Sequence, residues 1–280
     1  MSRVICIFGS RLVRVSKWAA AVLALSTAAV IAGVTPALVF AQTARPARNE
    51  VTLKDVQSGK VKQALASWWG FDPRDSTAAL QAAIDSQVPK LVVDKQLSPW
   101  IVSEIQLRSN QEILFEPGVE VLAKQGAFQA TSAALFTAWD CQNLSLIGPR
   151  ATLRMRRDDY AKAPYTKGEW RHVLSLRGCQ QVTVLGLTLA ESGGDGIYIA
   201  PGRTIRECRH VVIRDVVCDR NYRQGISVIS ADDLLIENCV LKNTAGTAPA
   251  AGIDFEPNHA EERLSNCVMR DCRIEDNQGY

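Results

Sequence analysis

The sequence has eight cysteines but no CxxC pair, and its first 41 residues carry the excess of basic residues, so no Lys/Arg-rich face is expected in the rest of the chain. Without cysteines at ligand spacing, structural zinc is not expected, and we predict no metal site. Without a Lys/Arg-rich face, nucleic acid is not an expected partner. No motif indicates a nucleotide or redox cofactor, so we expect no cofactor. The 280 residues are 47% hydrophobic and 22% charged, which is typical of a folded chain rather than a disordered one.

Acidic residues are missing from the first 41 positions. That segment holds four basic residues and an apolar run that starts at Trp18. This pattern predicts a secretory signal, residues 1–41, cut after Ala41, and hence a secreted or periplasmic protein. The alternative is an uncleaved anchor, because the run is long enough to span a bilayer. Removing four positive charges changes the formal net charge from +3 to about −1.

A glycine-opened phrase recurs four times along the second half of the chain. The phrases are "DGIYI", "QGISV", "AGIDF" and "QGY", with glycines at 196, 225, 252 and 279. The gaps between these glycines are 29, 27 and 27 residues. Each phrase follows an apolar pattern of two short alternating segments joined by a two-residue bend, so a repeat consists of three short strands. No segment of the repeat is long enough for a crossover helix.

Three short strands cannot bury an apolar face alone, so the repeats must stack on one another. The period and the strand number predict an all-β protein, a right-handed parallel β-helix with three-strand coils. The cysteines fit this arrangement, since Cys141, Cys179 and Cys208 share one column and Cys239 and Cys272 share another. We expect buried thiols rather than disulfides, because side chains on neighbouring coils rarely reach the torsion that a disulfide needs.

The N-terminal end of such a stack needs a cap, and "DPRDSTAALQAAIDS" predicts a short capping helix. Asp75 or Ser76 is the expected N-cap, with Leu80, Ala83 and Ile84 as the buried stripe. Residues 42–66 are predicted to be a linker and residues 67–280 the β-helix domain. The chain stops inside the fourth phrase, so we expect a truncated last coil. We expect a monomer.

Several stretches resemble a known group of proteins. "WWGFDPRDSTAALQAAIDS", "LRSNQEILFEPGVEVLA" and the series "GGDGIYI", "RQGISV" and "GIDFEPN" are similar to the pectin-lyase-like superfamily, specifically to bacterial exported β-helix-repeat proteins. The resemblance covers residues 67 to 280 and implies the fold more strongly than a reaction, because that superfamily includes hydrolases, lyases, epimerases and non-catalytic members. The Gly-His-Gly and Arg-Ile-Lys signatures of polygalacturonases are absent here, and so are the calcium-binding aspartates of pectate lyases.

Asp254 and Glu256 are the candidate catalytic pair. In the third strand of a coil, alternate residues point inward, so these two acids share the exposed face. Two residues along a strand span about 6.5–7 Å, which is compatible with the roughly 6.5–9.5 Å between the carboxyl groups of inverting glycosidases. A solvated sheet face is the alternative interpretation of both acids. Asp195 is interpreted as shaping an Asp-Gly turn, about 14 Å from Asp254.

Other side chains are predicted to assist this pair. His259 follows it directly and is a candidate base, while Tyr198 and Ser227 stand in the column of Asp254. Arg223 is interpreted either as an ordinary loop arginine or as a residue that holds a sugar carboxylate. Trp170, in an insertion at 154–172, is expected either to line the substrate site or to plug the solenoid.

Together these features predict an exported, polysaccharide-active enzyme that cleaves glycosidic bonds. A polysaccharide lyase acting on a uronate-containing glycan is one alternative, and calcium is then a possible cofactor. A non-catalytic glycan-binding or surface β-helix scaffold is the other alternative.

Overall fold

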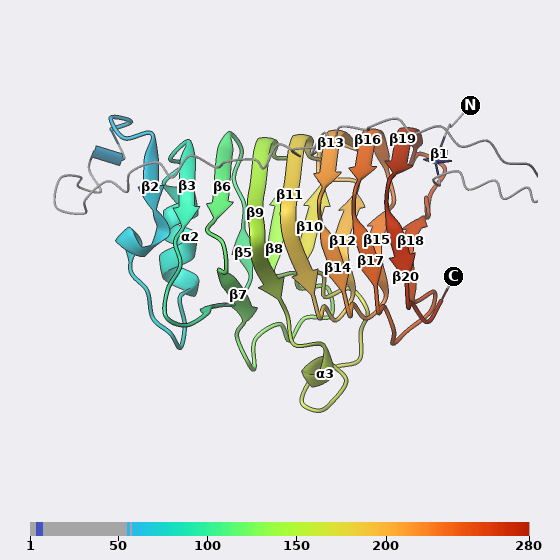
Figure 1. The fold of residues 1–280 in the computed structure, drawn as a ribbon, viewed down its shortest axis with the longest axis horizontal. Coiled ribbons are helices and arrows are strands. Elements are labelled where there is room, and N and C mark those ends of the chain that lie inside the picture. The colour runs from blue at the N-terminus through green and yellow to red at the C-terminus, as the bar shows by residue number, and fades with distance from the viewer. Residues whose placement is uncertain (1–3, 8–54, 57, 280) are drawn as a thin grey trace, which may run out of the picture.

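The computed structural model describes residues 4–7, 55–56 and 58–279, and it shows parallel strands wound into coils that stack along one long axis (Figure 1). One sheet has the strand order β18 (Ala251–Phe255), β15 (Gln224–Val228), β12 (Asp195–Ala200), β10 (Leu174–Arg177), β8 (Phe136–Trp139) and β5 (Ile105–Gln106). We call it the six-stranded sheet. The predicted parallel β-helix is confirmed.

The larger sheet supplies the two other faces of the solenoid. Its long path runs β1 (Val4–Ile7), β19 (Leu264–Arg270), β16 (Ala231–Glu237), β13 (Cys208–Arg214), β11 (Gln180–Ala190), β9 (Gln142–Arg154), β6 (Gln111–Phe115), β3 (Lys90–Val93) and β2 (Gln63–Leu65). Off this path lie β4 (Trp100–Val102), β7 (Glu120–Ala123), β14 (Val217–Asp219), β17 (Val240–Lys242) and β20 (Arg273–Glu275). A coil such as β16–β17–β18 therefore contributes three strands, as expected.

The register places equivalent residues of successive repeats side by side. Ile197 pairs with Ile226, which pairs with Ile253, and all pairings are parallel. Ile197 and Ile226 are fully buried. The glycine-opened phrases are therefore in line from β12 to β18, as the repeat predicted. Gly279 also approaches this column, since its N–H donates to the carbonyl of Ala250 at 2.8 Å.

The two-residue bends between the first and second strands rely on left-handed backbone. Asp215, Asn238 and Asp271 have φ of 56°, 52° and 55° at equivalent corners. Asn and Asp tolerate this conformation better than other non-glycine residues, because their short polar side chains form local hydrogen bonds. The two-residue bend predicted between the alternating segments is thereby confirmed.

Helix α2 (Thr77–Asp85) packs at the N-terminal edge of the six-stranded sheet, next to β5, while β2 lies further toward that end of the stack (Figure 1). Leu80, Ala83 and Ile84 are fully buried, as predicted. Ser76 occupies the N-cap position without a side-chain capping bond, whereas the Asp75 carboxylate accepts a hydrogen bond from the N–H of Thr77 at 3.0 Å. Of the two candidates, Asp75 thus supplies the capping oxygen.

Two further short helices complete the described elements: η1 (Ala66–Trp69), a 3-10 turn, and α3 (Arg157–Tyr160), which projects below the sheets in Figure 1. The seven cysteines from Cys141 to Cys272 are all free, and six of them are buried. The N–H of Cys179 donates to Sγ of Cys208 at 3.3 Å, and the N–H of Cys239 to Sγ of Cys272 at 3.4 Å. Stacked thiols in the predicted columns are confirmed.

The N-terminal boundaries differ from expectation in one place. Strand β2 lies inside 42–66, the segment predicted as a linker, and pairs with β3 from Gln63 to Leu65. The solenoid therefore begins before residue 67, because these residues add a parallel strand to the first coil. The predicted signal, residues 1–41, lies outside the described residues except for β1, which pairs in parallel with β19. Within the described ranges no helix has the length and apolar character to cross a membrane.

Candidate functional site

The predicted acids lie on the outward face of the six-stranded sheet, near the C-terminal end of the stack. Tyr198, Ser227 and Asp254 are paired in one column across β12, β15 and β18. Glu256 follows β18, and its N–H donates to the carbonyl of Val228 at 3.0 Å. This bond continues the strand ladder, so Glu256 stands two residues beyond Asp254 on the same face, as predicted.

Glu256 is the acid of the pair that forms a hydrogen bond with a cation. Its carboxylate accepts a bond of 2.6 Å from Nη2 of Arg223, and its side chain is 26% exposed. Burial raises the pKa of Glu256 above its ordinary value; Arg223 opposes the rise, while Asp254 and Asp195 add to it. A carboxyl group that keeps its proton to higher pH is suited to act as a general acid.

Asp254 is held by a neutral partner. Nε2 of Gln224 donates to its Oδ2 at 3.0 Å, while Oε1 of the same glutamine accepts the N–H of Ala251 at 3.1 Å. Gln224 is fully buried, so its position is fixed by the strand on which it stands. Gln224 therefore holds the Asp254 carboxylate through a neutral amide, and no described cation forms an ion pair with it.

Arg223 connects the acids to the interior. Besides Glu256, its guanidinium donates to Oγ of Ser227 at 3.2 Å and lies 3.7 Å from Oδ1 of Asp195. Desolvation lowers the pKa of Arg223, but Asp195 and Glu256 outweigh it and leave the pKa raised. The side chain is 14% exposed. Arg223 is therefore a permanent cation whose role is to position carboxylates.

Asp195 and His172 form the buried side of this cluster, and the sequence interpretation missed both. Asp195 is fully buried in β12 rather than in a turn, and it pairs with Gln224. Its N–H donates to Nδ1 of His172 at 3.1 Å, and its Oδ2 lies 3.3 Å from the same nitrogen. Its carboxylate oxygens accept no hydrogen bond from a described residue. A clue was available, because Asp195 has the inward parity of Ile197.

Tyr198 lies over this cluster. Its ring stacks on His172 with centroids 4.5 Å apart and planes at 6°, and the guanidinium of Arg177 lies 4.7 Å from its centroid. Burial raises the pKa of Tyr198, with Arg177 opposing the rise. Tyr198 therefore presents a phenol on the outward face, next to Ser227 and one strand further from Asp254, in the column that was predicted.

Three further predicted site residues differ in their exposure. Ser227 is fully buried and bonded to Arg223, so it supports Arg223 rather than facing solvent. His259 lies in the exposed loop after β18, where its N–H donates to Glu262 at 2.9 Å and its imidazole makes no hydrogen bond with a described residue. Trp170 is 47% exposed, so it does not plug the solenoid.

The plug of the 154–172 insertion is Arg171. It is fully buried, lies 5.3 Å from the ring centroid of Tyr160 and 5.7 Å from that of Tyr165, and donates to the carbonyls of Phe128 and Thr166. Anchored in this way, the insertion carries Glu169 beside the cluster, where Oγ1 of Thr247 donates to its carboxylate at 3.2 Å. Among the residues described, no group of three or more His, Cys, Asp and Glu side chains is arranged to hold a metal ion.

Known proteins share this architecture. The family described as "Right handed beta helix region" matches residues 202–280. A putative glycosyl hydrolase from Parabacteroides merdae is 16% identical with a TM-score of 0.52, covering 75% of this chain and 97% of its own. An iota-carrageenase, solved with iota-carrageenan fragments, is 15% identical with a TM-score of 0.59, covering 75% of this chain and 49% of its own.

One curated relative matches in sequence. The uncharacterized protein YclG of Bacillus subtilis (strain 168) is 26% identical over 156 residues, which is 52% of this chain and 26% of that protein. The match thus spans about a quarter of the relative's length. With the observed coils, these comparisons show the right-handed β-helix fold that the sequence predicted.

Proposed function

We propose that this protein is a polysaccharide-active enzyme that hydrolyses glycosidic bonds with Asp254 and Glu256. One observation carries the proposal: two outward carboxylates, two residues apart, are held by unlike partners. Glu256 is half-buried with a raised pKa and pairs with a cation, whereas Asp254 is held by a neutral amide. Carboxyl pairs whose surroundings differ in this way divide the roles of acid and base. The names of the structural relatives, a glycosyl hydrolase and a carrageenase, agree with this chemistry.

In the proposed reaction Glu256 protonates the glycosidic oxygen as the bond to the anomeric carbon breaks. Asp254 accepts a proton from the water that attacks this carbon from the other face. The separation of their Cα atoms along extended backbone, about 6.5–7 Å, leaves room for that water. Tyr198 and the exposed Trp170 are proposed to contact the sugar, and Arg223 to hold Glu256 in place.

Hydrolysis is favoured over elimination by the state of two candidate bases, Arg223 and Tyr198. A lyase needs a neutral base beside the sugar carboxylate, but Arg223 is a paired cation with a raised pKa. Burial likewise raises the pKa of Tyr198, which makes it a poor proton acceptor near neutral pH. Calcium is proposed as a cofactor only in the lyase alternative. We further propose export to the periplasm or the medium, guided by residues 1–41.

The test is turnover of a polysaccharide panel by purified wild type, Asp254→Asn and Glu256→Gln. Each variant is expected to lose about a hundred- to ten-thousandfold in kcat, because general acid–base catalysis supplies that range. Glu261→Gln is the control, since Glu261 is an exposed acid in the loop after β18 that pairs with Arg206.

Three outcomes would contradict the proposal. Full turnover in both variants would remove these two acids from the reaction. Product that absorbs in the ultraviolet through an unsaturated sugar end would assign a lyase. Glycan binding by a wild type that cleaves nothing on the panel would assign a binding scaffold.

A further inference from the structure

A second polar site lies on the same outward face, at the far end of the six-stranded sheet. Trp139 of β8 pairs with Arg177 of β10, which pairs with Ala200 of β12. This column continues through Ile229 to Glu256. Trp139 and Glu256 are four strands apart, which corresponds to about 19 Å at a spacing of about 4.8 Å per strand. A glycan lying along the face can reach both ends.

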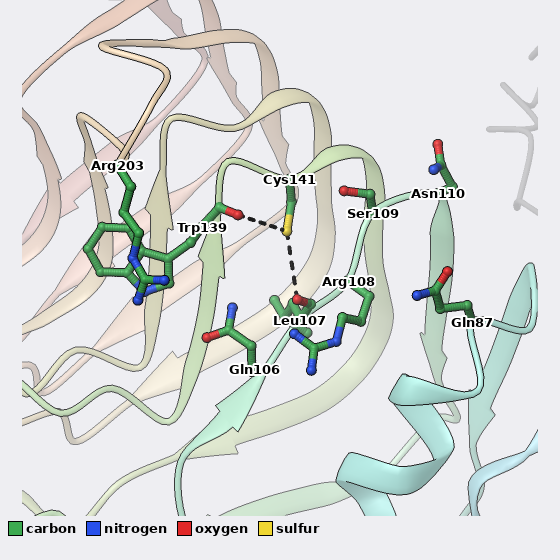
Figure 2. A pocket seen from close by; sticks show the side chains of 9 residues that line it. All are labelled: Gln87, Gln106, Leu107, Arg108, Ser109, Asn110, Trp139, Cys141 and Arg203. Carbon is green, nitrogen blue, oxygen red and sulfur yellow. Dashed lines mark hydrogen bonds between the residues drawn. The ribbon is translucent and has the colours of Figure 1, made fainter.

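The face opens next to Trp139 into a cavity of about 390 Å³, which we call the distal pocket (Figure 2). Its lining is polar and carries two cations, Arg108 and Arg203, but no acid. The neutral lining includes Gln87, Gln106 and Asn110. The volume falls in the range of small-molecule sites, roughly 300–1,000 Å³.

Arg203 is held over the pocket by a loop whose backbone is anchored by Asp140. The Asp140 carboxylate accepts the backbone N–H groups of Arg203, Thr204 and Ile205 at 3.0–3.3 Å. Burial raises the pKa of Asp140, but these N–H groups outweigh it and leave the pKa lowered. A Cβ added at Gly202 would collide with this carboxylate, so the tight approach depends on glycine there. The ionised Asp140 therefore fixes the loop that carries Arg203.

The guanidinium of Arg203 stacks on the ring of Trp139, and no described acid neutralises its charge. It lies over the Trp139 ring (Figure 2), 4.7 Å from the ring centroid, and forms no ion pair with a described acid. The other ring contact of Trp139 is with Arg177, at 4.9 Å. Stacking of this kind orients the fork of an arginine while leaving its N–H groups available to an anion.

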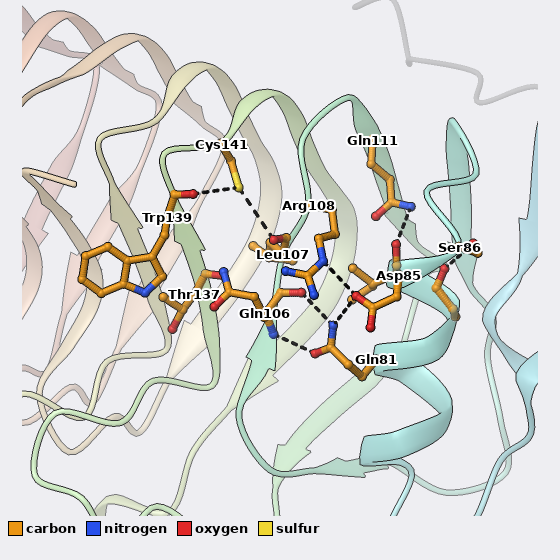
Figure 3. Close-up of polar contacts among 12 residues, drawn as sticks. Gln81, Asp85, Ser86, Gln106, Leu107, Arg108, Gln111, Thr137, Trp139 and Cys141 are labelled. Carbon is orange, nitrogen blue, oxygen red and sulfur yellow. Dashed lines mark hydrogen bonds and ion pairs between the residues drawn. The ribbon is translucent and has the colours of Figure 1, made fainter. Parts of the chain in front are cut away.

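Residues of the capping helix α2 hold Arg108 in place. Its Nε donates to Oδ1 of Asp85 at 2.8 Å, and Nε2 of Gln81 donates to the same oxygen at 2.9 Å (Figure 3). Oε1 of Gln81 accepts the N–H of Gln106 at 2.8 Å, which ties α2 to the edge of the pocket. Asp85 forms its ion pair with Nε, and no described residue contacts the two terminal nitrogens of Arg108, which we assign to the ligand.

We propose that the distal pocket is a subsite for an anionic sugar residue, carrying a carboxylate or a sulfate group, of the polysaccharide that the protein acts on. The inference rests on the proposed function for the identity of the ligand as a glycan. It is carried by the two pre-positioned arginines, which match a planar or tetrahedral anion by charge-assisted hydrogen bonds. Chains too short to span about 19 Å cannot occupy this subsite and the acid pair together.

The test measures binding, independently of turnover, by calorimetry in an otherwise unaltered chain carrying Glu256→Gln. The probes are an oligogalacturonate and a sulfated carrageenan oligosaccharide of matched length, with a neutral maltooligosaccharide for comparison. Preference for one anionic probe over the other distinguishes carboxylate from sulfate. Adding Arg203→Gln is expected to weaken binding of the preferred anionic probe about tenfold. Adding both Arg108→Gln and Arg203→Gln is expected to weaken its binding further.

Arg206→Gln is the matched control, because Arg206 follows in the same loop but pairs with Glu261 and does not line the pocket. It is expected to leave binding unchanged. Equal binding of all three probes, or undiminished anionic binding in the double arginine variant, would overturn the subsite. Loss of binding in that variant, together with full turnover in Asp254→Asn and Glu256→Gln, would uphold the subsite while the proposed function fails.

Discussion

Arg223 determines the electrostatics of the candidate site at the scale of single residues. It contacts Glu256 and Ser227 directly and lies near Asp195, and it is itself largely buried. A cation in this position lowers the pKa of Glu256 and thereby limits the rise that burial causes. The strength of the general acid therefore depends on Arg223 as well as on Glu256.

Arg223→Met is expected to shift the pH dependence of residual activity. With the cation removed, the pKa of Glu256 rises further, because only burial and the nearby acids remain. A general acid loses activity as pH rises through its pKa, so the alkaline limb of kcat/KM should move to higher pH. A pH–rate profile of the variant against wild type measures this. An unmoved or acid-shifted limb would contradict the role of Glu256 as acid.

Asp195 shows where residue-level interpretation stopped. An Asp-Gly pair is most often a turn, so the sequence predicts a turn at Asp195 and no role in the candidate site. In the structure it is buried beside His172 and Arg223, where its carboxylate balances the guanidinium. His172 was equally hidden in the sequence, because its neighbour is 23 residues away and is reached through the return of the chain by one coil.

At the scale of elements, α2 begins with a charged cap. Asp75 accepts the N–H and Oγ1 of Thr77 and forms an ion pair of 2.6 Å with Lys124. Its pKa is lowered to about 2, chiefly by the bond from Lys124 and then by Thr77. The folded state therefore binds this proton less readily than the unfolded chain, so the contribution is present above the ordinary pKa and is lost as pH falls toward 2.

Asp75→Ala is expected to lower the free energy of unfolding by about 1 kcal/mol near neutral pH, the usual value for losing a capping oxygen. The difference from wild type should shrink as the pH falls toward 2. Urea unfolding at several pH values measures both effects. Asp158→Ala, in the exposed first turn of α3, is the control. An equal loss in the control, or a difference that does not change with pH, would contradict the capping role.

The insertion at 154–172 also behaves as an element with its own anchor. Its most conspicuous aromatic residue, Trp170, is exposed, while the neighbouring Arg171 is buried against two tyrosine rings. Composition favours the reverse, because tryptophan is apolar and arginine is charged. The guanidinium is accommodated inside because backbone carbonyls accept hydrogen bonds from Nε and Nη2 and two tyrosine rings contact the cation, while Nη1 has no partner among the described residues.

At the scale of the whole molecule, stacking protects the thiols. Six of the seven cysteines from Cys141 to Cys272 are buried, and Cys272 in the last coil is half-buried. A hydrogen bond from Cys239 lowers the pKa of Cys272, whereas a similar bond and burial raise that of Cys239. Reactivity requires both access and thiolate, and Cys272 combines them best.

Iodoacetamide is therefore expected to label Cys272 first in a folded chain carrying Cys6→Ser. The other six cysteines should react only after unfolding in denaturant. Peptide mass spectrometry against time measures the order. Labelling of Cys179 or Cys208 as fast as Cys272 in the folded chain would show that the coils are not closed around these thiols.

The repeat made much of this architecture predictable. Glycine spacing and alternating apolar residues give coil length, strand number and inward faces, because a stacked coil buries the same positions on every turn. The columns of Tyr198, Ser227 and Asp254 and of the cysteines follow from that register. The edge at β2 did not, because a three-residue strand in a polar segment has too little periodicity to be recognised.

The sequence by itself determined the solenoid, its capping helix and the face on which Asp254 and Glu256 stand, because these depend on periodicity alone. Tertiary structure decided which polar groups meet. Loops of unequal length, which return from different coils, bring these groups together. They bury Asp195 and His172, place Arg223 between its acidic partners, and stack Arg203 on Trp139. Their course is fixed by local contacts, such as Asp140 with the N–H groups of its loop, which no repeat pattern encodes.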